Sequence, residues 1–366
     1  MPMRHSDARR GLLLFLRNAG ALAPILVPIL APVLFPFLIP FQASAATCKT
    51  QAQMPPEQRV ALASTSRILM GEVQNGDVQA LKQNTLPAVA ADFSGIAATV
   101  DSLKPFVAKA TITVENLYLL DSSAEPLAPR TDFFCGSPVV VMNLTDLPPG
   151  IYAVAIIHAT GVPQPQQMAL ILAQSADHRW LLGGFSYKPM LEAGHDGLWY
   201  WIAARKYAQR NMNLDAWFYL KTAANFLSPV DYLSSPNLDK LQHEEELVKP
   251  NNLPGSRPIT LSEQGALYQI TSIDTTDALG AFDLEVQYTP NAQQAAELRD
   301  PVSARKQVTQ VMVALLDLHP ELHEAFHGIW VHANQGATSL FSLDLPMDQI
   351  IPGPLTPPLI TNPVNR

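Results

Sequence analysis

The spacing of apolar residues changes from a helical period to a strand period near residue 110. Residues 55–76 place apolar side chains every three or four positions, and Asp77 follows as a candidate N-cap for a second helix. Helical spacing then continues to Pro105, which lacks the backbone donor that a helix interior needs. Residues 111–119 alternate between apolar and polar, as a half-buried strand does. The pattern predicts a group of helices followed by strands.

Three later runs also have strand character, at residues 151–160, 167–174 and 180–187. Residues 175–178 can join the second and third of these runs as a hairpin connection. Residues 122–130 are polar and predict a loop. The order of helices and then about four antiparallel strands, closed by the run RWLLGGFSYKP, resembles the NTF2-like family. The resemblance covers roughly residues 55–190 and implies a curved sheet wrapped over a long helix to form a cone. A cystatin-like domain has the same order, with its sheet packed on a helix.

Residues 198–227 are similar to one tetratricopeptide-type helical hairpin. Small and aromatic residues fall at the spacing of that family, namely Tyr200, Ala203, Ala204, Tyr207, Ala216, Leu220 and Ala223. Repeats of this type bury their faces against neighbouring repeats. We therefore interpret a single copy as a structural brace, with a partner-binding groove as the alternative.

The C-terminal third predicts a second small domain of ββαββ type. It has two strands, a helix and two further strands, at residues 266–273, 282–288, 305–326, 328–333 and 338–345. Before it, Glu244, Glu245 and Glu246 are expected to form a solvated helix face, and residues 249–255 read as a linker. The whole chain is thus predicted to be of α+β class.

The predicted organisation has six parts. They are a signal peptide at 1–46, an NTF2-like α+β domain at 47–190, a helical hairpin with a polar arm at 191–248, a linker at 249–257, a C-terminal α+β domain at 258–347 and a disordered Pro-rich tail at 348–366.

The first 46 residues have the features of an export signal. Arginines precede a long apolar run, and Ala43-Ser44-Ala45 fits a small-residue cleavage site. Five prolines at four-residue intervals disfavour a regular spanning helix, although an uncleaved membrane anchor is the alternative. We expect a periplasmic or extracellular protein, cut near Ala45, whose membrane contact is confined to this segment.

The two cysteines of the chain, Cys48 and Cys135, both lie beyond the cleavage site. An even number of cysteines in an exported protein predicts one disulfide, with two free thiols as the alternative. Neither cysteine belongs to a C-x-x-C pair, which gives a redox or zinc role little support.

The charge balance argues against nucleic acid as a partner. The chain has 24 basic and 32 acidic residues, and removing the four arginines and one acid of residues 1–46 leaves a net charge of −11. Binding to a phosphate backbone needs clustered Lys and Arg, and we find no basic stripe with interleaved aromatics.

The segment His323-Glu324-Ala325-Phe326-His327 spells H-E-x-x-H. On a helix this spacing would put two imidazoles on one face to bind zinc, with Glu324 as the general base for a zinc-bound water. Asp344 or Asp348 would have to supply the third ligand.

Two observations weaken this zinc hypothesis. Pro320 and Gly328 bracket the motif, so the helix around it must be short or kinked, and no Glu follows Glu324 in the chain. The favoured interpretation is a polar cluster at a helix end, with no metal and no other cofactor.

Two further groups could carry acid–base chemistry. His195 and Asp196 could form a base with its orienting acid, although Asp196 is better explained as the N-cap of the following helix. His158, Glu115 and Tyr118 could line the mouth of the cone, where the NTF2-like resemblance implies that enzymes keep their acid–base groups.

The sequence contains no complete catalytic set, no P-loop and no dinucleotide fingerprint. We expect an exported, non-catalytic binding or assembly module of the bacterial cell envelope, whose partner is an unknown protein or small molecule. The alternative is an enzyme, either a lyase, isomerase or hydrolase with an NTF2-like cavity or a zinc hydrolase using His323 and His327.

Overall fold

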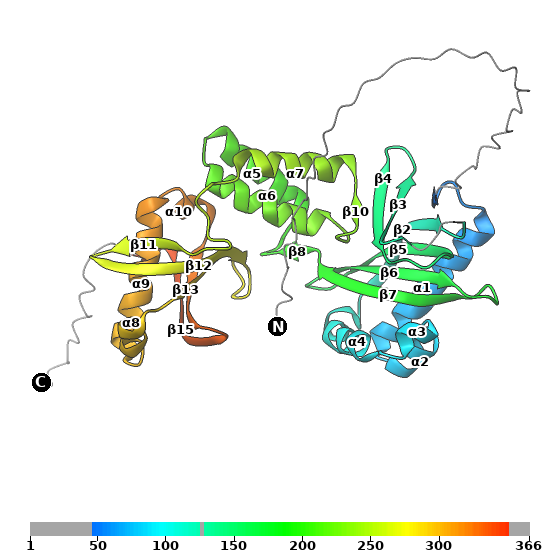
Figure 1. Cartoon of the computed structure of the whole chain (residues 1–366), viewed down its shortest axis with the longest axis horizontal. Coiled ribbons are helices and arrows are strands. Elements are labelled where there is room, and N and C mark those ends of the chain that lie inside the picture. The colour runs from blue at the N-terminus through cyan, green and yellow to red at the C-terminus, as the bar shows by residue number, and fades with distance from the viewer. Residues whose placement is uncertain (1–45, 125–127, 351–366) are drawn as a thin grey trace, which may run out of the picture. The chain divides into compact units, whose positions relative to one another are not determined.

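The N-terminal part of the structure contains four helices (Figure 1). The computed structural model describes residues 46–124 and 128–350. The helices are α1 (Pro56–Asn75), α2 (Val78–Gln83), α3 (Pro87–Ala90) and α4 (Ser94–Val107). Asp77 accepts a hydrogen bond from the Ala80 N–H, which confirms the predicted cap of α2. The expected stop at Pro105 is wrong by two residues, because Pro105 lies in the last turn of α4.

The first sheet has five strands, and every neighbouring pair in it is antiparallel. Its order is β1 (Thr47–Thr50), β2 (Thr111–Asp121), β5 (Ile151–Thr160), β6 (Gln166–Gln174) and β7 (Trp180–Pro189). The four strands predicted from the sequence are confirmed. The short strand β1 was not predicted, because four residues are too few to show an alternating pattern.

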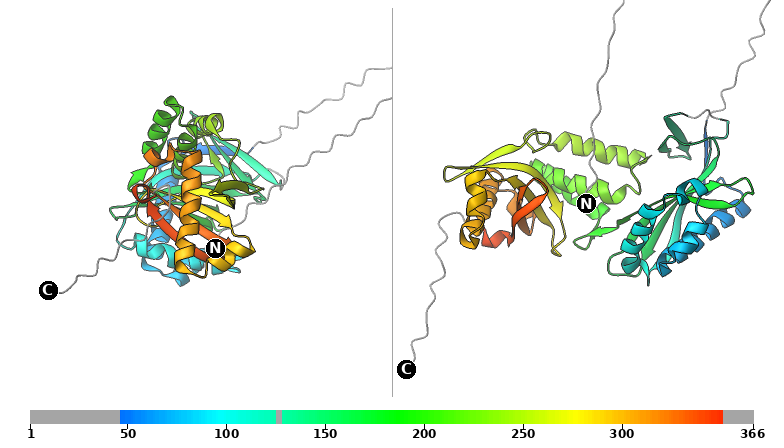
Figure 2. Two further views of the ribbon diagram at one scale, coloured as in Figure 1. Left: turned by 90° about the vertical axis from the view of Figure 1, so that its left-hand side faces the viewer. Right: turned by 60° about the horizontal axis from the view of Figure 1, so that its bottom comes forward.

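The first sheet is covered on both faces. Helices α1 and α4 pack on one face through a core that includes Leu62, Leu103 and Ile157 (Figure 2). A smaller sheet covers the other face, in the order β10 (Leu233–Ser234), β4 (Val140–Thr145) and β3 (Arg130–Cys135). Strand β3 follows the predicted loop 122–130 directly and was not predicted from the sequence.

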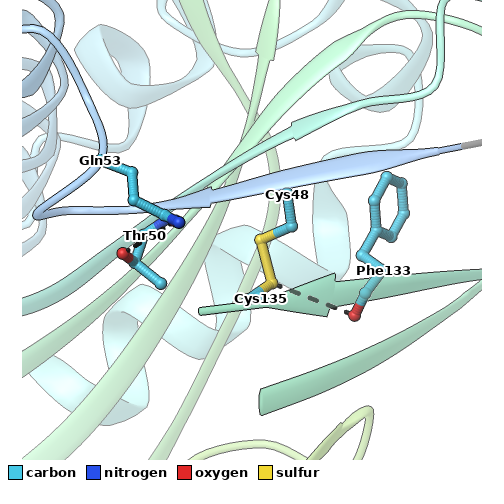
Figure 3. The surroundings of a disulfide bond; sticks show 5 residues. All are labelled: Cys48, Thr50, Gln53, Phe133 and Cys135. Carbon is cyan, nitrogen blue, oxygen red and sulfur yellow. Dashed lines mark hydrogen bonds between the residues drawn. A yellow bond between two sulfur atoms is a disulfide. The ribbon is translucent and has the colours of Figure 1, made fainter. Parts of the chain in front are cut away.

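A disulfide joins the first sheet to its cover. Cys48 in β1 is bonded to Cys135 in β3, 87 residues later (Figure 3). This confirms the predicted pairing. Disulfides persist in oxidising compartments, which is where such a bond is typically found. No helix within residues 46–124 or 128–350 is both long and apolar enough to cross a membrane.

Residues 191–248 contain a short hairpin of β8 (Leu191–Glu192) and β9 (His195–Asp196), followed by α5 (Gly197–Gln209), α6 (Asn213–Leu227) and α7 (Pro236–Val248). Gly197 starts α5 where the chain passes close to the end of α6. A Cβ atom at Gly197 would lie only 2.8 Å from Cγ of Leu227, so a larger residue would push the two helices apart.

The C-terminal sheet has one strand more than the predicted ββαββ unit. Its order is β11 (Ile259–Glu263), β12 (Ala266–Thr276), β13 (Asp283–Thr289), β14 (Gly328–Gln335) and β15 (Thr338–Pro346). Strands β13 and β14 are parallel, so a crossover must connect them, and it is formed by α8 (Ala292–Glu297), α9 (Pro301–Leu318) and α10 (Leu322–Ala325). The predicted α+β class is confirmed.

The helical hairpin and the C-terminal sheet share one hydrophobic core. The rings of Tyr200 and Tyr219 contact Phe282, and Phe282 stacks on Phe326. Residues 249–257 contain no helix or strand, as a linker would, yet Leu253 packs against this core. A lone hairpin needs a partner for its apolar face, and the C-terminal sheet supplies it.

The ends of the predicted parts lie partly outside the described residues. The predicted signal peptide at 1–46 lies outside the described residues except for Ala46, and the predicted tail at 348–366 lies outside them beyond Ile350. Met347 and Ile350 belong to the C-terminal core, so the chain remains packed beyond the predicted boundary at 347.

Candidate functional site

A pocket of about 270 Å³ lies against the face of the first sheet that also carries β3, β4 and β10. Its walls come from the sheet, from the helical hairpin and from the segment that links α6 to α7. The lining residues are Asn116, Tyr118, Val140, Ile156, Trp201, Leu227, Pro229, Leu233, Ser235, Asn237 and Leu238. The lining is mainly apolar with a few neutral polar groups, which is typical of small-molecule sites.

A β-bulge in β2 decides which residues face this pocket. The register of β2 against β5 shifts between Val114 and Asn116, so Glu115 is an extra residue. Beyond the bulge, Asn116 and Tyr118 line the pocket, whereas Leu117 packs against the helices on the opposite face. Without the bulge, alternation would place Leu117 on the same face as Thr113.

Trp201 forms one wall of the pocket, and its side chain is fixed by a hydrogen bond to Glu244 and by contact with Arg205. Its indole N–H donates to Oε2 of Glu244 at 2.7 Å, and Arg205 donates to both oxygens of the same carboxylate at 2.8 Å. The guanidinium also lies 4.4 Å from the centre of the indole ring. The hydrogen bonds from Arg205, more than those from Trp201, lower the pKa of Glu244. The expectation that Glu244 belongs to a solvated face is therefore wrong.

A row of polar residues crosses the same sheet face beside the pocket. Thr113, His158, Gln167 and Lys188 are direct cross-strand partners on β2, β5, β6 and β7, so their side chains share one face. Nε2 of His158 lies 3.0 Å from Oε1 of Gln167. The Gln167 side chain is buried, and its Nε2 has no hydrogen-bond partner among the described residues.

Lys188 ends this row under the C-terminal end of α6. Its ammonium group donates to the carbonyl oxygen of Asn225 at 2.9 Å. Burial lowers the pKa of Lys188, and the nearby Asp231 opposes that effect. The positive charge of Lys188 is thus partly compensated within the fold.

The structure brings together the three candidates expected at the mouth of the cone, but not as a catalytic set. Tyr118 lines the pocket, and burial raises its pKa, so its hydroxyl stays protonated. His158 and Glu115 lie beside the pocket and do not line it, and Nδ1 of His158 is 3.6 Å from Oε1 of Glu115. That separation exceeds a hydrogen bond, so Glu115 does not orient the imidazole in this conformation.

The second sequence candidate is a helix cap. Asp196 accepts a hydrogen bond from the Trp199 N–H at 2.8 Å, which confirms the interpretation of Asp196 as the N-cap of α5. His195 instead stacks on the indole of Trp199, with ring centres 3.7 Å apart. The acid and the imidazole therefore have separate partners.

The H-E-x-x-H segment does not form the helix that the zinc hypothesis requires. Helix α10 ends at Ala325, and the His327 N–H donates to the Phe282 carbonyl as β14 begins. Glu324 is paired with Arg210, and Nδ1 of His327 lies 3.1 Å from Oδ1 of Asp283.

His323 and His327 therefore do not share a helix face. Among the residues that the structure describes, no group of three or more His, Cys, Asp or Glu side chains is placed to hold a metal. Asp344 and Asp348, the suggested third ligands, belong to no such group.

Sequence reasoning missed a polar cluster on the outer face of the C-terminal sheet. Ser342 Oγ lies 2.7 Å from Nδ1 of His332, and Glu285 Oε1 lies 3.6 Å from its Nε2. Burial lowers the pKa of His332, against the effect of Glu285. A serine, a histidine and an acid in this order also form the catalytic triad of serine hydrolases. Ser342, however, is exposed and lines none of the pockets found among the described residues. Only the register of β14 and β15 reveals the pair.

Two other pockets, of about 300 and 270 Å³, lie along α1. Each includes an apolar side chain that is largely exposed, Ile68 in one and Val60 in the other. The pocket over the first sheet is instead built on buried residues such as Tyr118, Ile156 and Leu233, so we take it as the candidate site.

Comparison with known proteins adds no further assignment. No protein-family model, curated protein or solved structure matches this chain. Its function must therefore be argued from the site itself.

Proposed function

We propose that the protein is an exported, non-catalytic binding module of the bacterial cell envelope, and that the pocket over the first sheet holds its ligand. The observation that carries this proposal is a mostly apolar pocket whose Trp201 wall is already fixed by Arg205 and Glu244. A wall fixed before binding loses little conformational entropy when a ligand arrives. The neighbouring acid and imidazole are not hydrogen-bonded to each other, which favours binding over chemistry.

Export to the periplasm or the extracellular space is part of the same proposal. It is supported by the signal-like features of residues 1–46 and by the Cys48–Cys135 disulfide. Cell fractionation and the intact mass of the recovered protein test it. We expect a periplasmic or secreted chain that starts near Ala46. A full-length chain in the cytosol with free thiols would contradict export.

The NTF2-like resemblance predicts a cavity between the curved sheet and its long helix, whereas Tyr118 and Ile156 line a pocket on the opposite face of the first sheet, on the side of β3, β4 and β10. The choice of site is therefore supported by the pocket and not by the resemblance. The tetratricopeptide-like hairpin would then serve as a brace, since Trp201 and Leu227 from its helices close the pocket.

The test of the proposed site is a variant that fills the pocket. Asn116 is exposed and lines the pocket, so Asn116→Trp should occupy its volume without disturbing the core. Thr111→Trp is the matched control, because Thr111 is an exposed residue of the same strand that does not line the pocket.

Ligand-observed NMR with a mixture of uncharged, anionic and cationic fragments provides the readout. We expect some fragments to bind the wild type and the control and to lose binding to Asn116→Trp. If the same fragments bind all three proteins equally, or if none binds the wild type, the pocket is not the ligand site.

A second candidate function, a cavity lyase, isomerase or hydrolase, rests on one specific observation. Glu115 Oε1 lies 3.6 Å from Nδ1 of His158, next to the cross-strand pair of Asn116 and Ile156 that lines the pocket. A ligand that brought Glu115 within hydrogen-bond distance of His158 would make His158 a general base with Glu115 as its orienting acid. Turnover of a bound fragment that is lost in His158→Gln, with binding retained, would favour this enzyme over the binding module.

A further inference from the structure

The charges around the pocket restrict what it can bind. None of the described residues that line it carries a charge. The ion pair of Arg205 with Glu244, next to the Trp201 wall, is closed by two hydrogen bonds, so its two charges compensate each other. Outside the pocket, Glu115 faces His158 and Lys188 donates to Asn225. A charged ligand group would therefore enter without a counter-charge, and such burial is costly.

The shape of the lining favours a ring. Trp201 is a flat wall that Arg205 and Glu244 hold rigid, and Tyr118 adds a second aromatic side chain. Leu227 and Pro229 supply compact apolar surface across from the sheet. Aromatic walls bury a large area of ligand in defined stacked or edge-on arrangements.

Three polar side chains in the lining are available to a ligand. Asn116, Tyr118 and Asn237 make no side-chain hydrogen bond to any other described residue. Each can donate and accept without being ionised, since an amide and a phenol both remain neutral near pH 7. They match one uncharged hydrogen-bonding group, such as a hydroxyl, carbonyl or amide.

We propose that the pocket binds an uncharged ring compound, aromatic or alicyclic, of about 10 to 15 non-hydrogen atoms with one hydrogen-bonding group. This inference rests on the proposed function and specifies its ligand class. The ring lies against Trp201, and the polar group is held by Asn116, Tyr118 or Asn237.

Three probes of one shape separate charge from size. They are 2-naphthamide, which is uncharged, 2-naphthoate, which is anionic, and 2-naphthylmethylamine, which is cationic near pH 7. Titration calorimetry at pH 7 measures the affinity of each probe for the full mature chain. We expect 2-naphthamide to bind at least about tenfold more tightly than either charged probe, because neither charge finds a partner in the pocket.

A pair of tryptophan variants tests the role of the aromatic wall. Trp201→Leu should weaken 2-naphthamide binding about tenfold or more, through loss of the flat wall. Trp199→Leu is the control, since Trp199 lies on the same helix, is 42% exposed and does not line the pocket. Circular dichroism of both variants shows that the fold is retained. Equal weakening in both variants, or in neither, would overturn the ring-stacking argument.

The outcomes also separate this inference from the proposed function. If a charged probe binds as tightly as 2-naphthamide, and Asn116→Trp removes both, the pocket is a ligand site but the proposed ligand class is wrong. If 2-naphthamide binds equally to the wild type and to Asn116→Trp, the binding lies elsewhere and both proposals fail.

Discussion

The two five-stranded sheets of this protein bury their strands in different ways. In β5 of the first sheet, the six residues from Tyr152 to Ile157 are all buried, so both faces are covered. In β14 of the C-terminal sheet, buried and half-buried residues alternate after Ile329, so one face is packed and the other, with Trp330, His332 and Asn334, is half-exposed. A strand buried on both faces needs two covering layers, whereas an alternating strand needs one.

This difference explains where the pocket lies. The second cover of the first sheet is assembled from segments far apart in the chain, namely β3, β4 and the segment from Val230 to Leu238. Such a cover meets the sheet imperfectly, and the space left between them is the pocket. The half-exposed face of the C-terminal sheet instead carries polar pairs such as His332 and Ser342, which hydrogen-bond to each other there.

The largest expected effect is on the first sheet and comes from removing its disulfide. Cys48→Ala with Cys135→Ala opens a loop of 87 residues, and the chain-entropy estimate for that loop is a loss of about 4–5 kcal/mol. Hydrogen exchange followed by mass spectrometry should show lost protection in β5 and β6 and unchanged protection in β13 and β14. Equal losses in both sheets would show that they unfold as one cooperative unit and would break the comparison.

The next largest effect belongs to the core that the helical hairpin shares with the C-terminal sheet. Asp215 in α6 is fully buried, and neither carboxylate oxygen has a hydrogen-bond partner among the described residues. Burial first, and then Glu321 and Glu324, raise its pKa to about 7, while Arg210 opposes them. The folded protein therefore keeps a proton on Asp215 that the unfolded chain releases near pH 4.

The sign of the pH dependence follows from that proton. Between about pH 4 and pH 7 the folded state binds more protons than the unfolded state, so stability falls as the pH rises, and the loss is complete above pH 7. Asp215→Asn removes this slope and should raise the free energy of unfolding by about 2–4 kcal/mol at pH 8. Urea unfolding at pH 4 to 8 measures it. An unchanged slope in the variant would mean that another group carries the pH dependence.

The sequence predicted the elements of the first sheet better than their packing. Alternation identified β2, the NTF2-like resemblance placed Tyr118 among the candidates, and the cysteine count identified the disulfide. The bulge at Glu115 could not be seen, since an extra residue leaves no mark on composition. Trp201 and Asn237 were also missed, because periodicity reports only local structure and these residues approach β2 across more than 80 positions.

The H-E-x-x-H segment shows the opposite failure, in which a local pattern suggested chemistry that the packing does not build. Its spacing is correct for a zinc site, but Pro320 lies just before α10 and His327 already hydrogen-bonds to Phe282 as β14 begins. The flanking residues, which can be read from the sequence, were a better guide than the motif.

The smallest predicted effect compares one buried polar side chain in each core. In the C-terminal core, Gln307 Nε2 donates to the hydroxyl of Tyr288 at 2.7 Å, and both side chains are buried. Tyr288→Phe leaves this amide donor without an acceptor and should cost about 1–2 kcal/mol. In the first core, the buried hydroxyl of Ser66 donates to the Leu62 carbonyl of its own helix. That carbonyl already belongs to the helical ladder, so Ser66→Ala should change stability by less than about 0.5 kcal/mol.

The double variant Tyr288→Phe with Gln307→Leu sharpens this contrast. Replacing both partners removes the unsatisfied donor, so most of the stability lost in Tyr288→Phe should return. Urea unfolding of the two single variants, the double variant and Ser66→Ala gives the comparison directly. If the double variant is less stable than Tyr288→Phe alone, the cost arises from packing of the ring and not from the orphaned amide.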